Sequence, residues 1–126
     1  LLAIGPRGWN AMLADVYEKL YFGIRQRNEE IRLVMQEIAS SPHPILLCGD
    51  FNDIPYSYTY KQVNKVLRNA YDEAGWGFGF SLNRMPWFVR IDHIFYSDRF
   101  RALNCEVIRD VGLSDHFPVL ARVQFK

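Results

Sequence analysis

Three short segments carry acidic, amide and imidazole side chains within stretches that are otherwise apolar. They read GDFND at residues 49–53, RIDH at residues 90–93 and SDH at residues 114–116. Carboxylate oxygens are the ligands that hard cations such as Mg²⁺ prefer, and an imidazole can transfer a proton near neutral pH. These residue types indicate metal-assisted or acid–base chemistry, provided that the fold brings the three segments to one place.

The first segment follows a short run at residues 44–48 that is apolar on both faces, which is typical of a strand buried in a sheet. If the strand continues, its period of two places Asp50 and Asn52 on the same side and Phe51 on the other. An acid beside an amide at the rim of a sheet suits a metal-binding or phosphate-binding edge. The alternative is a plain turn, because Gly, Asn, Asp and Pro favour turns.

The second segment places Asp92 inside an apolar stretch, residues 89–96, that is predicted to be a strand. A buried carboxylate needs a partner, since burying it alone costs several kcal/mol. Two partners are open: Arg90, two residues back on the same face, or a histidine that Asp92 would hold in one tautomer. His93 points to the opposite face and is interpreted as a structural residue.

The third segment is predicted to be a loop that leads into the last strand, because Pro118 favours an extended Phe117. Asp115 and His116 can reach one site only if the backbone turns between them. The carboxylate would suit Mg²⁺, and the imidazole would suit proton transfer or contact with a developing negative charge.

The remaining pattern mixes helices and strands without repeats, which indicates the α/β (α+β) class. Ser57 or Thr59 is expected to cap a helix that extends to about Asn69. Gly23 is either a kink or a break between two helical stretches. The expected helices are residues 10–22, 24–39 and 58–69, the glycine–aromatic segment 75–80 is a twisted strand or a loop, and the expected strands are residues 44–48, 89–96, 103–108 and 119–125.

Composition places the chain among globular domains. It has 126 residues, a formal net charge of +1, 49% hydrophobic residues and 15% aromatic residues, so a disordered chain and a strongly basic nucleic-acid-binding tail are excluded. No apolar run approaches the roughly 18 residues of a membrane span. Cys48 and Cys105 match no zinc or redox spacing, and Cys48 is expected to be a buried free thiol.

The order GDFN, RID and SDH before a terminal strand resembles the endonuclease/exonuclease/phosphatase superfamily, over residues 25–125. This family includes nucleases and other phosphodiesterases as well as phosphatases. The resemblance implies part of a two-layer β-sandwich of mixed sheets flanked by helices. It also implies a hydrolase that cleaves a phosphodiester or a phosphomonoester with an activated water and Mg²⁺, or Mn²⁺, as cofactor.

The resemblance also implies a role for each polar residue. Asp50 matches the acid that orients or deprotonates the attacking water, and Asn52 matches the amide that hydrogen-bonds the scissile phosphate. Asp92 matches the acid that orients the catalytic histidine, and His116 matches that histidine. Asp115 matches a carboxylate of the metal site.

The chain lacks the motifs of the family's amino-terminal half, which carry a metal-binding Glu, another Asn and a further His or Tyr. Residues 1–126 are therefore expected to be the carboxyl-terminal portion of one such domain. We expect weak Mg²⁺ binding, little hydrolysis by this chain alone, and self-association through exposed sheet faces. The substrate class stays open among nucleic acid, a phospholipid headgroup and a small phosphate ester.

Two other hypotheses compete with the hydrolase. In a binding or interaction module with a relic site, Asp92 would pair with Arg90, and His116 would point to solvent. In an unrelated α/β binding domain, the three segments would lie apart. In the enzyme, His116 and Asp92 should lie within hydrogen-bond reach, with Asp50 and Asn52 facing them.

Overall fold

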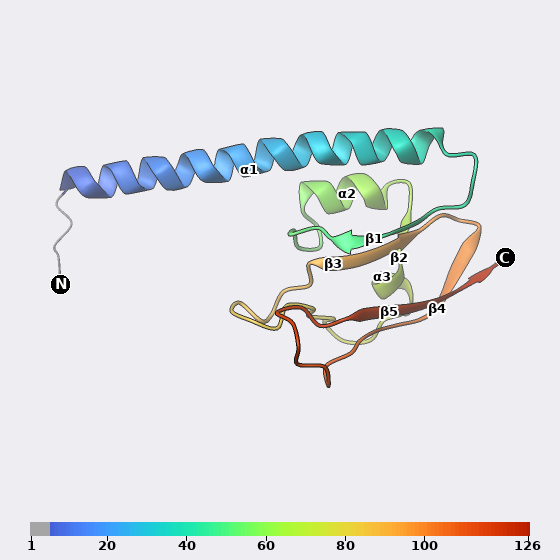
Figure 1. Ribbon diagram of the computed structural model, residues 1–126. Helices are drawn as coiled ribbons and strands as arrows, with labels where there is room; N and C mark the ends of the chain where they lie inside the picture. The colour runs from blue at the N-terminus through green and yellow to red at the C-terminus, as the bar shows by residue number, and fades with distance from the viewer. Residues whose placement is uncertain (1–5) are drawn as a thin grey trace. The chain divides into compact units, whose positions relative to one another are not determined.

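The computed structural model describes residues 6–126 (Figure 1). The chain forms two compact units, Leu1–Val34 and Met35–Lys126, and each is described by itself. Helix α1, Pro6–Ser40, makes up the described part of the first unit and enters the second. It passes through Gly23 without interruption, so the predicted break is wrong, whereas the predicted end at Ser40 is confirmed.

The first sheet of the second unit has three strands in the order β1-β3-β2, and its neighbours pair antiparallel. They are β1 (Leu46–Asp50), β3 (Asp92–Tyr96) and β2 (Arg68–Asn69). The central strand β3 pairs with β1 in a register that sets Asp50 opposite Asp92. Two of the three polar segments are therefore brought together by strand pairing alone.

Helix α2, Tyr58–Asn64, begins at Ser57, whose hydroxyl oxygen accepts a hydrogen bond from the Tyr60 backbone N–H at 3.2 Å. Of the two predicted caps, Ser57 is therefore the one used. The helix ends before Asn69, because residues 68–69 pair with β3 instead. The Asn69 side chain then caps the short helix α3, Ala70–Ala74.

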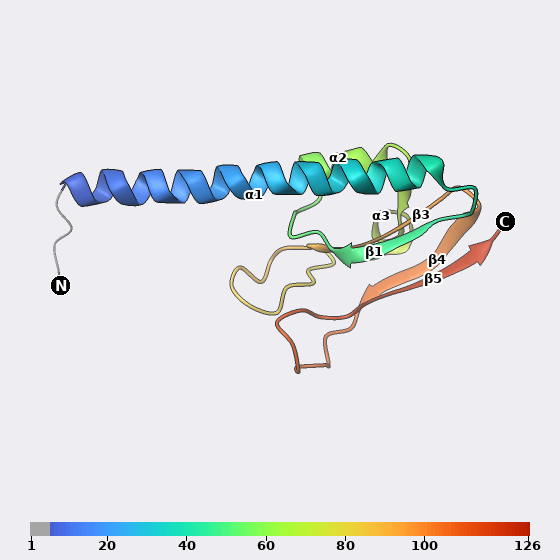
Figure 2. The same cartoon turned by 45° about the horizontal axis from the view of Figure 1, so that its top comes forward.

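The second sheet pairs β4 (Phe100–Val107) with β5 (Val119–Phe125), antiparallel and side by side in Figure 2. A buried core joins it to the first sheet and to α3, and its members are Ala70, Tyr96, Phe100 and Cys105, packed against Ile94, Ala102, Val119, Ala121 and Val123. The α/β (α+β) class in two layers is thus confirmed. The sheets of the described part are antiparallel, and the isolated bridge between Gly75 and Cys105 runs parallel.

Strand β3 alternates as predicted. His93 and Phe95 are 2% and 0% exposed and contact the Tyr60 ring of α2, with ring centroids 4.9 and 5.3 Å away. Ile94 and Tyr96 face the core between the sheets, so Asp92 lies on that side too. The histidine beside Asp92 is therefore a packed residue of the opposite face, and burial lowers its pKa.

The structure also decides the burial of the two cysteines and the conformation of the glycine–aromatic segment. Cys48 is exposed, so the prediction of a buried thiol is wrong: it lies on the edge strand β1, which pairs with a neighbouring strand on one side only. Cys105 is the buried cysteine, and burial raises its pKa to about 11. The glycine–aromatic segment is a loop, with positive φ at Gly77 and Gly79. No helix in the part of the chain that the structure describes has the length and apolar character needed to span a membrane.

Candidate active site

Strand pairing creates an electrostatic problem at the end of the first sheet. Asp50 and Asp92 face each other across β1 and β3, and the Phe51 N–H bonds the Ile91 carbonyl oxygen at 2.9 Å just beyond them. Like charges directly opposite on paired strands destabilise a sheet. Two carboxylates in this position therefore call for a positive group close to both.

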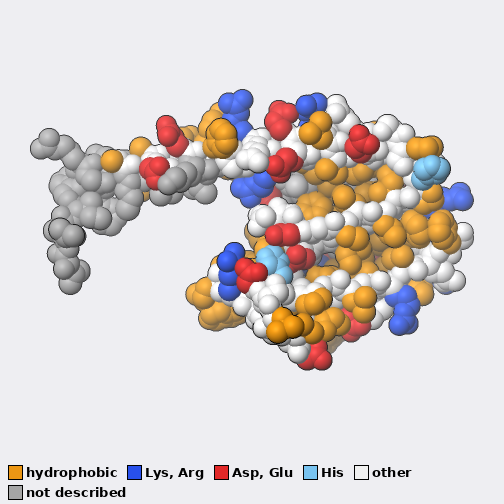
Figure 3. Space-filling view, viewed as in Figure 1, with side chains coloured by type: hydrophobic (Ala, Val, Ile, Leu, Met, Phe, Trp, Pro, Cys, Tyr) orange, Lys and Arg blue, Asp and Glu red, His pale blue; other side chains and the backbone are white. Residues whose placement is uncertain are grey.

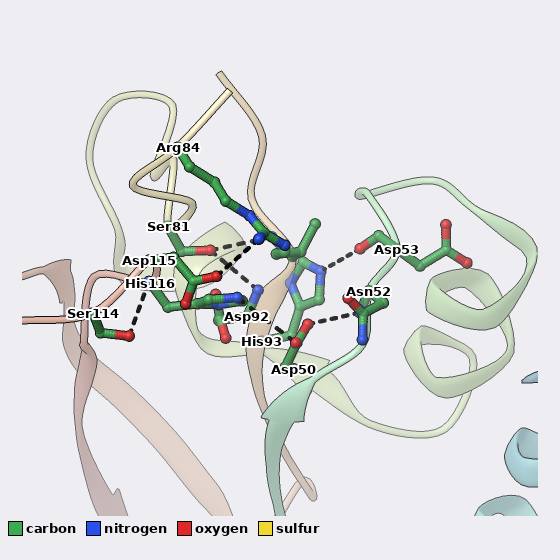
Figure 4. A network of polar contacts seen from close by, with 11 residues as sticks. Asp50, Asn52, Asp53, Ser81, Arg84, Asp92, His93, Ser114, Asp115 and His116 are labelled. Carbon is green, nitrogen blue, oxygen red and sulfur yellow. Dashed lines mark hydrogen bonds and ion pairs between the residues drawn. The ribbon is translucent and has the colours of Figure 1, made fainter. Parts of the chain in front are cut away.

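His116 lies against this pair (Figure 4). Its Nδ1 is 2.8 Å from Asp92 Oδ2, and its Nε2 is 3.9 Å from Asp50 Oδ2. The three segments converge as the enzyme hypothesis requires, and the hypothesis of an unrelated domain with separated segments is wrong. His116 comes from the loop before β5, so the packing of the second sheet on the first brings it here.

Arg90 is not the partner of Asp92. Its Nη2 binds Asp72 Oδ1 at 2.6 Å, and its guanidinium lies over the Tyr71 ring, 4.7 Å from the centroid. The predicted Arg90–Asp92 alternative is therefore wrong, because α3 supplies a better-placed acid. Asp92 is left available to His116, as the enzyme hypothesis expects.

The environment favours the protonated form of His116. The hydrogen bond to Asp92 raises the pKa of the imidazole, partial burial opposes that effect, and the negative charges of Asp92, Asp50 and Asp115 add to it. A carboxylate can only accept a hydrogen bond, so the 2.8 Å contact with Asp92 favours the neutral tautomer that carries its proton on Nδ1 and leaves Nε2 unprotonated.

We predict that the pKa of His116 lies above the ordinary value and falls in Asp92→Asn. The folded-state pKa is raised, so this contact stabilises the fold fully below about pH 6.5 and loses its effect as pH rises through the folded-state pKa. NMR titration of the metal-free chain measures the His116 pKa before and after the substitution. A His116 pKa at or below the ordinary value, unchanged by Asp92→Asn, would contradict the assignment.

The backbone after Asp50 turns instead of continuing as a strand. The Asn52 N–H donates to Asp50 Oδ1 at 2.8 Å, and Asn52 has φ of 47°. The turn alternative is therefore right for the backbone, and the expected strand alternation does not extend to Asn52. The turn nevertheless keeps Asn52 beside Asp50 (Figure 4).

Asp115 lies at the edge of the site. Its Oδ2 is 3.1 Å from Arg84 Nη1, and both side chains are at least half exposed. The structure thus places Asp115 next to His116 in the chain but in an ion pair with Arg84. Sequence reasoning missed Arg84, since a single arginine after a glycine–aromatic segment carries no recognisable signal.

The site fits a divalent cation. Asp50, Asp92 and His116 each offer a ligand atom, and these atoms lie within 4.8 Å of one another. Carboxylate oxygens suit Mg²⁺ and Mn²⁺, and the imidazole is the better ligand for Mn²⁺. A cavity of about 460 Å³ adjoins the three residues and is also lined by Cys48 and Ile94. Figure 3 shows acidic and histidine side chains gathered beside hydrophobic ones on this unit.

Comparison with known proteins identifies relatives in sequence and in fold. Residues 7–116 match the endonuclease/exonuclease/phosphatase family. No curated protein matches the chain. Among solved structures, a mannosyl-6-phosphatase from Bacteroides thetaiotaomicron is similar at 28% identity with a TM-score of 0.65, covering 80% of this chain and 46% of its own.

Two further solved structures are described as members of the same family. One from Bacteroides thetaiotaomicron has 28% identity and a TM-score of 0.67, and the match covers 81% of this chain and 46% of that one. One from Bacteroides vulgatus has 25% identity and a TM-score of 0.67, covering 79% and 44%. This chain therefore spans less than half the length of the solved structures that it matches. With the family match over most of its length, the chain belongs to the endonuclease/exonuclease/phosphatase family.

Proposed function

We propose that this chain carries the GDFN, RID and SDH parts of the active site of a metal-dependent phosphoesterase. The observation that carries the proposal is the arrangement of His116 between two acids, with Nδ1 2.8 Å from Asp92 and Nε2 3.9 Å from Asp50. Family membership and the phosphatase among the similar structures support hydrolysis of a phosphate ester.

His116 acts at Nε2 in this proposal. Asp92 holds Nδ1–H and stabilises the imidazolium, so the ring can present a proton at Nε2 toward the space beside Asp50. Hydrolysis of a phosphate ester builds negative charge on the phosphoryl oxygens and the leaving oxygen. A charged donor in a partly buried site lowers the energy of that state, and His116 is 25% exposed.

In this proposal Asp50 orients the attacking water and Asn52 binds the phosphate. Asp50 Oδ2 faces the histidine, while its Oδ1 is held by the Asn52 N–H, so the carboxylate has a fixed orientation. Such a carboxylate can orient a water and accept its proton. The side-chain amide of Asn52 would donate to a phosphoryl oxygen.

The cofactor proposed is Mg²⁺, with Mn²⁺ as the alternative. Of the group formed by Asp50, Asp92 and His116, Asp50 would contribute a carboxylate oxygen, because Asp92 and His116 are hydrogen-bonded to each other. Asp115 would contribute a second carboxylate oxygen and exchange its ion pair with Arg84 for the cation. A bound cation would supply positive charge that offsets the negative charge on the phosphoryl oxygens. Because the Arg84 pair is exposed, breaking it costs little.

The proposed substrate is a phosphate ester, and activity assays distinguish a phosphomonoester from a phosphodiester. The similar mannosyl-6-phosphatase favours testing a sugar 6-phosphate, and the family description favours testing a phosphodiester. The net charge of +1 gives no electrostatic reason to prefer a nucleic acid or an anionic lipid surface. Mannose 6-phosphate and bis(p-nitrophenyl) phosphate are therefore the first two substrates.

We predict slow turnover by the 126-residue chain, below about 1 s⁻¹, the lower end of the usual enzyme range. The reason is the small set of acids available for the cation, without the Glu that the family resemblance implies. Phosphate release is followed with Mg²⁺, with Mn²⁺ and with EDTA. Faster turnover would contradict the predicted upper limit on the rate. Phosphate release that is independent of metal and of His116 would contradict the proposed function.

We further propose that the chain self-associates through its open sheet surfaces. Leu46, Leu103 and Leu120 are 51%, 48% and 56% exposed, and β1 is an edge strand. Apolar side chains on strands with an unpaired edge favour pairing with another chain. Sedimentation at several concentrations should show dimers or larger species, and a folded monomer throughout the range would contradict this prediction.

A further inference from the structure

Residues 81–83 lie between the two segments that carry Asp92 and His116. This stretch follows the glycine–aromatic loop and belongs to none of the three motifs. Ser81 is 0% exposed and Leu82 is 5% exposed, so the stretch is anchored in the interior. Figure 4 shows Ser81 beside Asp92.

One side of this stretch holds the strand of Asp92. The Ser81 hydroxyl oxygen accepts hydrogen bonds from the backbone N–H groups of Ile91 and Asp92, each at 3.2 Å. The Ser81 N–H donates to the Val89 carbonyl oxygen at 3.0 Å. A buried hydroxyl shared by two consecutive N–H groups fixes the backbone from which the Asp92 side chain extends.

The other side holds the loop of His116. The Ser81 carbonyl oxygen accepts from the Phe117 N–H at 2.7 Å, and Leu82 bridges His116. The Asn83 N–H donates to the Asp115 carbonyl oxygen at 2.7 Å, and Asn83 Nδ2 donates to the Ser114 carbonyl oxygen at 3.1 Å. Every residue of the SDH loop therefore meets this stretch.

We infer that residues 81–83 form a positioning clamp that sets the distance between Asp92 and His116. The inference rests on the proposed function, in which this pair is catalytic. His116 lies in a loop outside β5, so pairing between the two strands of its own sheet does not fix it. The clamp ties both segments to one buried serine, which keeps two groups 24 residues apart in the chain at 2.8 Å. Misplacement by about 1 Å can cost a hundredfold in rate.

The test reads the tautomer of His116 directly, by long-range ¹⁵N–¹H NMR of the ring nitrogens at a pH where the ring is neutral. In the unmodified chain the bond to Asp92 should keep the proton on Nδ1. Ser81→Ala removes the acceptor of two backbone N–H groups and should let Asp92 move away from His116. Loss of the single hydrogen bond between Asp92 and His116 should then raise the ratio of the Nε2-protonated to the Nδ1-protonated form by roughly fivefold. Asn83→Ala should shift the ratio in the same direction from the loop side.

Ser97→Ala is the matched control, because the Ser97 hydroxyl also accepts a hydrogen bond from a backbone N–H, that of Ile45 at 3.0 Å. Ser97 directly follows β3, at the opposite end of the strand from Asp92. It should leave the His116 tautomer unchanged. If Ser81→Ala does not fold, Asn83→Ala decides, since Asn83 is exposed and its loss leaves the core intact. An unchanged tautomer in a folded Ser81→Ala or Asn83→Ala chain, or an equal shift in Ser97→Ala, would overturn the clamp. The measurement needs neither substrate nor metal, so absence of hydrolysis would count against the proposed function alone.

Discussion

Replacing His116 with glutamine should lower metal-dependent phosphate release by about 10²–10⁴-fold, the usual contribution of a positioned acid or base. Glutamine keeps a polar side chain of similar length but cannot carry a proton at the position of Nε2. It also removes the positive partner that lies 2.8 Å from Asp92 and 3.9 Å from Asp50. Initial rates under saturating Mg²⁺ measure the effect, after NMR or circular dichroism has shown that the variant is folded.

His43→Gln is the control for this substitution. His43 is exposed, and its backbone N–H and carbonyl oxygen are hydrogen-bonded to the Ser41 hydroxyl. The control should keep the activity of the unmodified chain. A folded His116→Gln variant that retained more than about a tenth of the rate would exclude His116 from the chemistry.

Asp50→Asn should separate activity from stability. The substitution should lower the rate by about 10²–10⁴-fold, because the neutral amide cannot accept the proton of a water. The turn should survive, since the side-chain oxygen of asparagine can still accept from the Asn52 N–H, as Asp50 Oδ1 does at 2.8 Å. The free energy of unfolding should change by less than about 1 kcal/mol, because the lost attraction to His116 is offset by the lost repulsion from Asp92.

Asp53→Asn is the matched control within the same motif. Its carboxylate points away from the site in Figure 4, and its contact to His93 is made by the backbone carbonyl oxygen at 3.2 Å. Chemical denaturation and phosphate-release assays of both variants give the comparison. Equal loss of activity in the two variants, or unfolding of Asp50→Asn, would contradict the role given to Asp50.

Much of the secondary structure could be predicted from local sequence patterns. The alternation of β3, the Ser57 cap and the strand at residues 119–125 follow from side-chain periodicity and from capping chemistry, which act over a few residues. The end of α2 could not be predicted from the local pattern, which is compatible with a helix as far as Asn69. In the structure Asn69 pairs with β3 and caps helix α3 instead. The exposure of Cys48 depends on the edge position of β1, and no local pattern reports an edge.

The partner of Asp92 shows most clearly what depended on tertiary structure. From the sequence, Arg90 and a distant histidine were both possible, and the nearer residue has the smaller cost of closing a loop. Asp72 of α3 takes Arg90, with the Tyr71 ring beneath the guanidinium, and this leaves the carboxylate of Asp92 for His116. The position of α3 therefore determines which residue pairs with Asp92, and that position depends on packing against both sheets.

The sequence by itself determined the family, the classes of side chain at the site and their order along the chain, because motifs are set by local chemistry. Only the tertiary structure decided that Asp50 and Asp92 lie opposite each other, that His116 reaches both, and that Ser81 joins their segments. Distances between segments far apart in the chain depend on strand register and on the packing of two sheets. Those quantities arise from many weak contacts summed over the unit, and no single stretch of residues encodes them.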